Sequence, residues 1–404
     1  MREAGWARWV LAGTTLVVTA LVVAGVLLAL RPLPALSLTA RVISPGQPGL
    51  PAISWPEARQ SAVAVDGLGR TWSSGGQAEV PIASVTKIMT AYLVLRDHPL
   101  SGDEQGPLIP VTSEDVAEYK SAVKQGDSNA KVAAGHPLTE RQALEALMLP
   151  SADNVAWLLA EWDAGSNDAF AAKMNATARS LGMNHTEYTD PSGLAESTVS
   201  TALDQLVMVR QAMKVPAFAS IVAEPSATIP VAGVIRNYNT RTGQNGIIGV
   251  KTGTDGAAQG CWAFAIRRQV GGAQRTVYGV VLGAPAPFAD LAPVAIAAGV
   301  QLADAMPGTV QRITVLPVGT VVGQIKVPWH KTPVSVVTTR ALSGLAVAGM
   351  RVTLSGQPNL PRSFSAGTTV GQFSANGLVG PATTPVVTTR ASGNPSIWWR
   401  IFRN

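Results

Sequence analysis

Cysteine, histidine and charged residues are scarce in this chain, and their scarcity limits what the protein can be. Cys261 is the single cysteine among 404 residues, so an intrachain disulfide is excluded. The four histidines are scattered without ligand spacing, and we expect neither a metal site nor a cofactor. The formal net charge of +6 includes no basic cluster, which argues against nucleic acid as a partner.

One long run without charge lies near the N-terminus. Residues 9–30 would form about 33 Å of helix, enough to cross a bilayer. Arg2 and Arg8 precede the run, so the positive-inside rule leaves residues 1–8 in the cytoplasm and the rest outside. A cleaved signal peptide is the alternative, although its apolar region would be shorter and Leu38-Thr39-Ala40 fits a cleavage site poorly. We expect an uncleaved, single-pass membrane anchor.

Composition divides the remaining chain into further segments. Residues 31–56 are rich in proline, which predicts a stiff spacer. Residues 57–308 begin and end with strand-like runs and carry helical blocks between them, which predicts an α+β domain. Short alternating runs between Gly and Pro turns in residues 310–380 predict a small β-sandwich. Within it, Gly319–Gln324 is echoed by Gly367–Gln372.

The end of the chain predicts a linker and a short helix. Residues 381–393 contain Thr and Pro and are assigned to the linker. In residues 394–404, Asn394 suits an N-cap and Pro395 the first helical position. An amphipathic helix in the membrane interface and a tail packed on the β-domain, or without fixed structure, both remain open. The apolar side chains that would share one face of the helix are Ile397, Trp398, Ile401 and Phe402.

Three short motifs carry the chemistry of the main body. A lysine three residues after a serine on a helix faces the same side, so the Lys87 amine can take the Ser84 hydroxyl proton as the serine attacks a carbonyl carbon. The amine acts as a base only if burial or a second cation, here Lys251, lowers its pKa. In chain order the motifs are Ser84-Val85-Thr86-Lys87, Ser151-Ala152-Asp153-Asn154 and Lys251-Thr252-Gly253-Thr254.

Each motif alone is a weak signal. Ser121–Lys124 repeats the serine–lysine spacing among polar residues without an apolar helix behind it, and we interpret it as surface. Ser151 alone would be taken as a helix N-cap, and residues 251–253 as a surface hairpin turn. The ordered set instead favours one acyl-transfer site, in which Ser151 relays a proton and Lys251 binds a substrate carboxylate.

The third motif also offers groups beyond its lysine. Gly253 would let the backbone come close to a substrate, because it lacks a side chain. A hydroxyl of Thr252 or Thr254 would add a hydrogen bond, and the backbone N–H of Thr254 would join that of Ser84 in an oxyanion hole.

With these motifs, roughly residues 55–300 resemble the low-molecular-weight penicillin-binding proteins that act as serine D-alanyl-D-alanine carboxypeptidases. The resemblance implies a β-lactamase/transpeptidase-like α+β fold outside the cytoplasm, followed by a β-rich domain. It implies that Ser84 is acylated by peptidoglycan stem peptides, which lose their last D-alanine, and by β-lactams as inhibitors. Lys87 would be the base and Ser151 the proton relay. Further shared runs are Leu181–Met183, Asp190–Leu194 and Ser200-Thr201-Ala202 with Asp204.

Two positions depart from the family pattern. Asp153 stands where the family has asparagine, and Asn154 follows it; both are candidates for substrate contact. An ionised aspartate accepts hydrogen bonds but cannot donate them, which predicts weakened turnover unless Asp153 pairs with Lys87 or Lys251. Gln259 stands where the family usually has glycine.

Other functions remain as alternatives to the carboxypeptidase. A β-lactamase or a D,D-endopeptidase of the same superfamily would use the same nucleophile. A β-lactamase would also need a glutamate to activate water, and Glu187 is the nearest candidate without the expected surroundings. A membrane-tethered binder of stem peptides, weakened by Asp153, is the non-enzymatic alternative.

Overall fold

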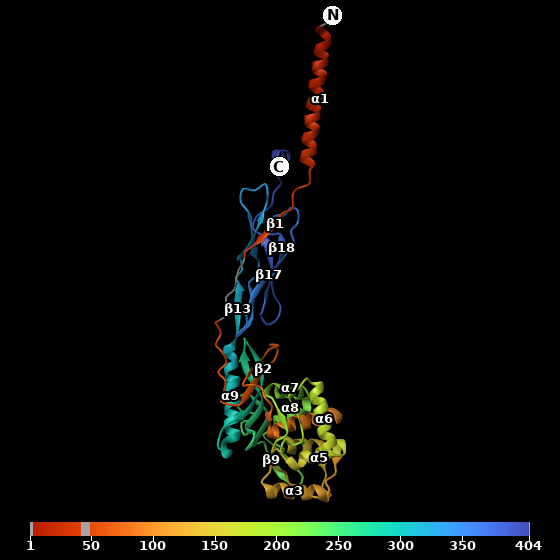
Figure 1. Ribbon diagram of the computed structural model, residues 1–404, viewed down its shortest axis with the longest axis vertical. Helices are drawn as coiled ribbons and strands as arrows, with labels where there is room; N and C mark the ends of the chain where they lie inside the picture. Colours follow the sequence, from red (N-terminus) through yellow and green to blue (C-terminus); the bar gives the residue numbers. More distant parts are fainter. Residues whose placement is uncertain (1–2, 42–48, 404) are drawn as a thin grey trace. The chain divides into compact units, whose positions relative to one another are not determined.

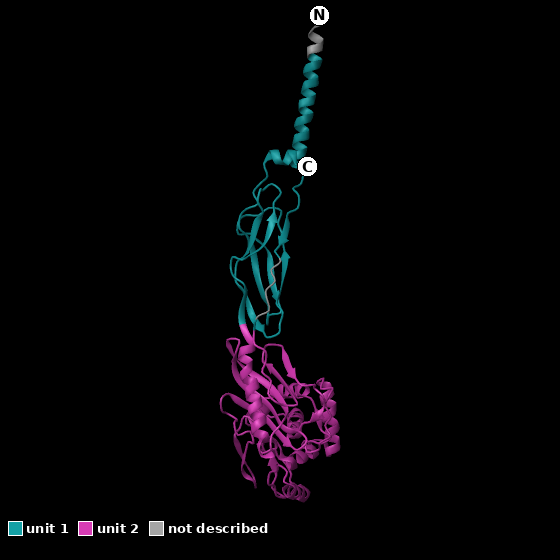
Figure 2. Ribbon diagram, turned by 60° about the vertical axis from the view of Figure 1, so that its left-hand side comes forward, with its two compact units in different colours: residues 1–49, 312–404 teal, residues 50–311 magenta. Residues whose placement is uncertain are grey.

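The computed structural model describes residues 3–41 and 49–403, which divide into two compact units, coloured separately in Figure 2. Unit 2 comprises residues 50–311 and carries the three motifs. Unit 1 comprises residues 1–49 and 312–404. Along the chain, unit 2 is therefore inserted into unit 1.

Unit 2 is built on a five-stranded antiparallel sheet, in the order β10-β11-β12-β2-β3. Helix α9 packs on β11 and β12, while α7 packs on β2 and β12, and these helices lie on either side of the sheet in Figure 1. All six residues of β2 are buried as a result. The strands are β2 Gln60–Val65, β3 Thr71–Ser74, β10 Ile247–Asp255, β11 Gln259–Val270 and β12 Ala273–Ala284.

Helix α2 is the centre of the helical part of unit 2, because it contacts helices α4 to α8. Ile88, Met89 and Leu93 of this helix are fully buried. Threonine N-caps precede three other helices, and their hydroxyls accept the backbone N–H of the third residue on. The helices are α2 Lys87–Asp97, α3 Ser113–Gln125, α4 Glu140–Met148, α5 Asp153–Ala164, α6 Asn167–Ser180, α7 Ala202–Ala212, α8 Pro216–Val222 and α9 Leu291–Thr309.

Short elements complete unit 2. Two 3₁₀ turns, η1 Ala83–Thr86 and η2 Phe288–Asp290, precede α2 and α9. Three antiparallel strand pairs lie outside the main sheet: β4 Val80–Pro81 with β7 Val199–Ser200, β5 Leu108–Ile109 with β6 Leu138–Thr139, and β8 Ser226–Ile229 with β9 Gly233–Arg236.

Unit 1 contains a six-stranded sheet, in the order β1-β14-β15-β19-β18-β17, so the C-terminal part of the chain is a β-sheet domain. A two-stranded ribbon, β13 with β16, accompanies it, and β13 crosses the boundary between the units. The strands are β1 Ser37–Ala40, β13 Val310–Leu316, β14 Val321–Lys326, β15 Val334–Thr338, β16 Leu342–Val347, β17 Thr353–Pro358, β18 Thr369–Asn376 and β19 Ala382–Thr388.

The sequence echo in unit 1 is a structural repeat. Gly319–Gln324 leads into β14 and Gly367–Gln372 into β18. Each strand has a register shift at the same place, before Gly323 in β14 and before Gly371 in β18. Strand β1 pairs with β14 as β17 pairs with β18, so each half of the sheet has three equivalent strands. Strand β1, the first strand of one half, therefore precedes unit 2 in the sequence, whereas the other strands of the sheet follow it.

The predicted boundaries of the spacer and the linker were wrong. Residues 37–40, assigned to the spacer, form β1. Residues 382–388, assigned to the linker, form β19 in the middle of the sheet. Their Thr and Val side chains alternate between buried and less buried positions, which is the two-residue period of a strand.

The two ends of unit 1 meet through hydrogen bonds. The apolar run lies in helix α1, Glu3–Leu30, and the C-terminal helix α10 spans Ile397–Phe402. Helix α10 begins after Ser396, whose hydroxyl accepts the N–H of Trp399, rather than at the predicted Asn394 cap. Arg400 donates to the carbonyl of Ala29, and Arg403 donates to the carbonyls of Arg31 and Pro32. These cations satisfy carbonyls at and just after the C-terminal end of α1.

Candidate active site

Ser84 lies in the 3₁₀ turn η1, one short turn before α2, and its side chain is partly exposed. Strand β10 runs directly beside this turn, since a Cβ atom on Gly253 would lie 3.0 Å from the backbone N of Ser84. The turn begins at Ala83, whose φ of +46° is unfavourable for a residue with a side chain. The close approach of β10 therefore depends on a glycine in the third motif.

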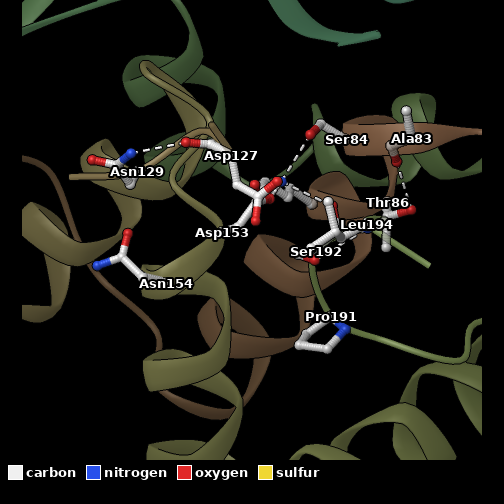
Figure 3. A network of polar contacts seen from close by, with 12 residues as sticks. Ala83, Ser84, Thr86, Asp127, Asn129, Asp153, Asn154, Pro191, Ser192 and Leu194 are labelled. Carbon is white, nitrogen blue, oxygen red and sulfur yellow. Dashed lines mark hydrogen bonds and ion pairs between the residues drawn. The ribbon is translucent and has the colours of Figure 1, made fainter. Parts of the chain in front are cut away.

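Lys87 is the first residue of α2 and its side chain is fully buried. Its amine donates to Ser84 Oγ at 2.8 Å, to Asp153 Oδ1 at 2.5 Å and to the carbonyl of Ser192 at 2.8 Å. The three acceptors come from η1, α5 and the loop before β7 (Figure 3). All three donors of a lysine ammonium are therefore satisfied.

In the second motif, Asp153 contacts Lys87, whereas Asn154 stabilises the fold. Asp153 opens α5, pairs with Lys87 and donates its backbone N–H to Ser128. Asn154 is buried, and its side-chain amide accepts from the N–H and donates to the carbonyl of Ala130. The expected substrate contact of Asn154 was therefore wrong: its amide clamps the loop after α3 to α5.

Ser151 stands out by its backbone and by its hydroxyl. Its φ of +64° lies in the left-handed region, which raises the free energy of any residue that has a side chain. Its Oγ is buried and has no hydrogen-bond partner among the described residues. A buried hydroxyl without a partner, held in a strained turn, is a candidate to bind or relay a proton once a substrate arrives.

The third motif lies on β10. Lys251 is buried, and its amine donates to the carbonyl of Thr252 at 2.9 Å. Burial lowers the pKa of Lys251 well below its usual range, and the charge of Lys87 lowers it further, against the opposing effect of Asp153. The two lysine amines are thus electrostatically coupled. Thr252 is buried as well, whereas Thr254 is exposed.

Gln259 occupies the end of the β10–β11 hairpin, opposite Asp255. Its φ is +60°, and its side-chain amide donates to the carbonyl of Gly256. Glycine adopts this backbone conformation without steric cost, which gives a physical reason for the family's preference at this place.

The loop that supplies the Ser192 carbonyl was not predicted to belong to the site. The carboxylate of Asp190 accepts the backbone N–H groups of Ser192, Gly193 and Leu194 and the hydroxyls of Ser192 and Thr198. Such a set of bonds to one carboxylate fixes the loop. The run Asp190–Leu194 was noticed as a shared motif, but nothing in it indicated which atom would face Lys87.

A second carboxylate near the site was also missed. Asp127 follows α3, and its Oδ2 atom is buried without a hydrogen-bond partner among the described residues. Burial raises the pKa of Asp127, the charge of Asp153 raises it further, and the charge of Lys87 opposes both. Asp127 is among the residues drawn with this polar network in Figure 3.

Comparison with known proteins identifies the family. Residues 58–286 match the family model described as D-alanyl-D-alanine carboxypeptidase. The chain belongs to this family. A D-alanyl-D-alanine carboxypeptidase of Streptomyces sp. (strain K15) is 33% identical over 235 residues, which are 54% of this chain and 77% of that protein.

Further relatives agree with this result. The D-alanyl-D-alanine carboxypeptidase DacB2 of Mycobacterium tuberculosis (strain ATCC 25618 / H37Rv) is 35% identical over 211 residues, covering 50% of this chain and 67% of that protein. The crystal structure of the Streptomyces K15 DD-transpeptidase superposes with a TM-score of 0.55 at 26% identity. The superposition covers 63% of this chain and 98% of the K15 chain. The α+β fold of unit 2 is thus the transpeptidase-like fold of serine D-Ala-D-Ala peptidases.

Proposed function

We propose that the protein is a penicillin-binding D-Ala-D-Ala carboxypeptidase that removes the terminal D-alanine from peptidoglycan stem peptides. The contact between the Ser84 hydroxyl and the Lys87 amine supports this proposal most directly. A serine hydroxyl that is partly exposed and 2.8 Å from a buried amine is arranged for nucleophilic attack with proton removal. Ser84 is the acylated residue and Lys87 its base.

The reaction proceeds through an acyl-enzyme. Ser84 Oγ attacks the carbonyl carbon of the last peptide bond and passes its proton to Lys87. The backbone N–H groups of Ser84 and Thr254 stabilise the oxyanion that forms. The C–N bond then breaks as the leaving D-alanine amine receives a proton through Ser151. Water next adds to the Ser84 ester, which releases the shortened peptide and restores the serine hydroxyl.

The third motif binds the substrate in this proposal. Lys251 carries the positive charge that attracts the terminal carboxylate of the stem peptide. An incoming carboxylate would offset the cost of keeping this buried amine charged. Thr252, Gly253 and Thr254 form the length of β10 along which the substrate lies. A β-lactam resembles this substrate and acylates Ser84 in the same way.

Helix α1 anchors the protein in the membrane in this proposal. Its segment Arg8–Leu30 has 23 residues and a mean hydropathy of 2.4. Arg8 at its start supports a cytoplasmic N-terminus and an extracytoplasmic unit 2. Residues 288–309 are also long and apolar enough to cross a membrane, but α9 is a core helix with Leu302, Ala303 and Met306 fully buried. Helix α10 would lie at the outer surface of the membrane, beside the end of α1.

Labelling with a fluorescent penicillin tests the proposal. The full-length protein in detergent is expected to take one covalent label, and the Ser84→Ala variant none. Release of free D-alanine from a pentapeptide stem identifies the carboxypeptidase. Cleavage of cross-linked stem-peptide dimers alone would identify an endopeptidase, and rapid loss of the label with turnover of penicillin a β-lactamase. A protein that takes no label and releases no D-alanine would overturn the proposal.

A further inference from the structure

The hydrogen bonds of Lys87 raise a question about its role as a base. Its amine donates to three acceptors, and an ammonium with three satisfied donors has no lone pair for the Ser84 proton. The amine must lose one proton before it can accept another. Among its three partners, the Ser192 carbonyl cannot hold a proton, and Ser84 has to give up its own proton in the reaction. Asp153 is the partner that can take it.

We propose that Asp153 is the proton acceptor behind Lys87, so that Ser84, Lys87 and Asp153 form a relay. In this relay an N–H bond of Lys87 first breaks and an O–H bond forms at Asp153 Oδ1, which leaves a neutral amine. The O–H bond of Ser84 then breaks and an N–H bond forms at Lys87. The serine oxygen gains the electron pair with which it bonds to the carbonyl carbon. No co-reactant is needed, and the proposal rests on the serine-enzyme function proposed above.

The geometry of the pair suits such a transfer. The two steps cover 2.8 Å and 2.5 Å, and they share the Lys87 nitrogen. Both partners of the second step are shielded from water, because Lys87 is fully buried and the Asp153 residue is 4% exposed. An ion pair loses its solvation in such surroundings, which narrows its free-energy advantage over a neutral amine and a neutral carboxylic acid. A buried carboxylate next to the base can therefore hold the proton that the amine gives up.

Asp127 supports the relay from the other side. The backbone N–H of Asp153 donates to Ser128, and Asn154 clamps Ala130, so the loop that carries Asp127 is fixed beside α5. The repulsion between the Asp127 and Asp153 carboxylates is relieved when either takes a proton. Asp127 thus acts as a positioning residue that makes Asp153 a better acceptor.

The other charged group coupled to this pair is Lys251, on β10. Its burial and its coupling to Lys87 disfavour two ammonium groups side by side. Proton transfer from Lys87 to Asp153 removes one of these cations without any exchange with solvent. When the leaving amine needs a proton, Asp153 returns it to Lys87, and Ser151 passes it on.

The pH dependence of acylation distinguishes the relay from a simple ion pair. In the wild type, Asp153 takes the Lys87 proton within the site, without exchange with solvent. In the isosteric Asp153→Asn variant, Lys87 has to release its proton to solvent before it can act. We expect the variant to be at least about tenfold slower than wild type at pH 5 and equal to it at pH 9.

The experiment measures acylation of the full-length protein by a fluorescent penicillin from pH 5 to 9. Asp153→Glu is expected to recover part of the rate at pH 5, and Asp127→Asn to slow acylation a few-fold. Exposed Asp168 in α6 gives the control Asp168→Asn, which should follow the wild type. In H₂O/D₂O mixtures, a plot of the acylation rate against the deuterium fraction should be curved for the wild type, because two protons move. The same plot should be linear for Asp153→Asn.

Two results would overturn the relay while leaving the serine enzyme intact. One is an Asp153→Asn variant that is as fast as, or faster than, wild type at pH 5, since the ion pair would then only restrain Lys87. The other is a linear dependence of the wild-type acylation rate on the deuterium fraction. This measurement uses the wild type alone and does not require any variant to fold. A wild type that takes no penicillin label would instead remove the proposed function, and the relay with it.

Discussion

A Cβ atom on Gly193 would lie 2.0 Å from the carbonyl oxygen of Ala83. The loop held by Asp190 therefore closes onto the backbone of the turn that carries Ser84, with no room for a side chain between them. This contact places the Ser192 carbonyl at the Lys87 amine. The nucleophile and the orientation of its base are thus fixed by one close backbone approach.

Gly193→Ala tests this approach. The φ of Gly193 is +80°, so alanine is strained there, and its methyl group would also push the loop away from Ala83. We expect penicillin acylation to fall at least about 100-fold, because a displacement of about 1 Å at a catalytic group has such an effect. Gly182→Ala is the matched control, since Gly182 has φ +77° but no atom within 4 Å of the added carbon. Equal rates in both variants would contradict the packing argument.

Replacing Lys87 separates the active serine–lysine motif from its copy. Lys87→Met removes the amine beside Ser84, and we expect acylation to fall at least about 100-fold, as for the loss of a general base. The variant also leaves Asp153 buried without its cation, so a lower melting temperature is expected. Lys124→Met in the exposed Ser121–Lys124 copy should change neither property. Rapid acylation of a folded Lys87→Met protein would show that another group activates Ser84.

Glu140 gives unit 2 a stability that falls as pH rises. Burial raises the pKa of its side chain from 4.5 to about 7, and neither carboxylate oxygen has a hydrogen-bond partner among the described residues. The folded state holds this proton more tightly than the unfolded chain, so its contribution is complete below pH 4.5 and is lost as pH rises through 7.

The Glu140→Gln variant removes this dependence. Its free energy of unfolding should exceed that of the wild type by about 3 kcal/mol at pH 8 and should nearly match it at pH 4.5. Urea unfolding at the two pH values measures the difference. Glu114→Gln, at an exposed position in α3, serves as the control and should show no such change. A constant difference across this pH range would show that Glu140 does not titrate as described.

Part of the site follows from sequence because its spacing is local. Three residues along one helical turn bring Ser84 and Lys87 together, so this contact could be predicted without a fold. The pairing of Asp153 with Lys87 was one of two alternatives, because both lysines were candidates. Asn154 was misassigned because adjacent residues at a helix start point in different directions, which only the position of α5 decides.

Other features depend on contacts between distant segments. The Ser192 carbonyl is a backbone atom, and residue types alone do not indicate which carbonyl will face an amine. Asp127 reaches the site because Asn154 holds the loop behind it. Strand β1 has only four residues, and its partner β14 begins at Val321. Such a short strand in a proline-rich stretch gives no periodic signal strong enough to outweigh the prolines.

The place of β1 in the C-terminal sheet has a practical consequence for anyone who wishes to isolate the enzyme portion. Deleting residues 312–404 alone would strip β1 of β14 and leave its hydrogen-bonding edge bare. Without its partner strand, β1 would promote aggregation between molecules. A clean fragment has to be trimmed at both ends, to residues 50–311.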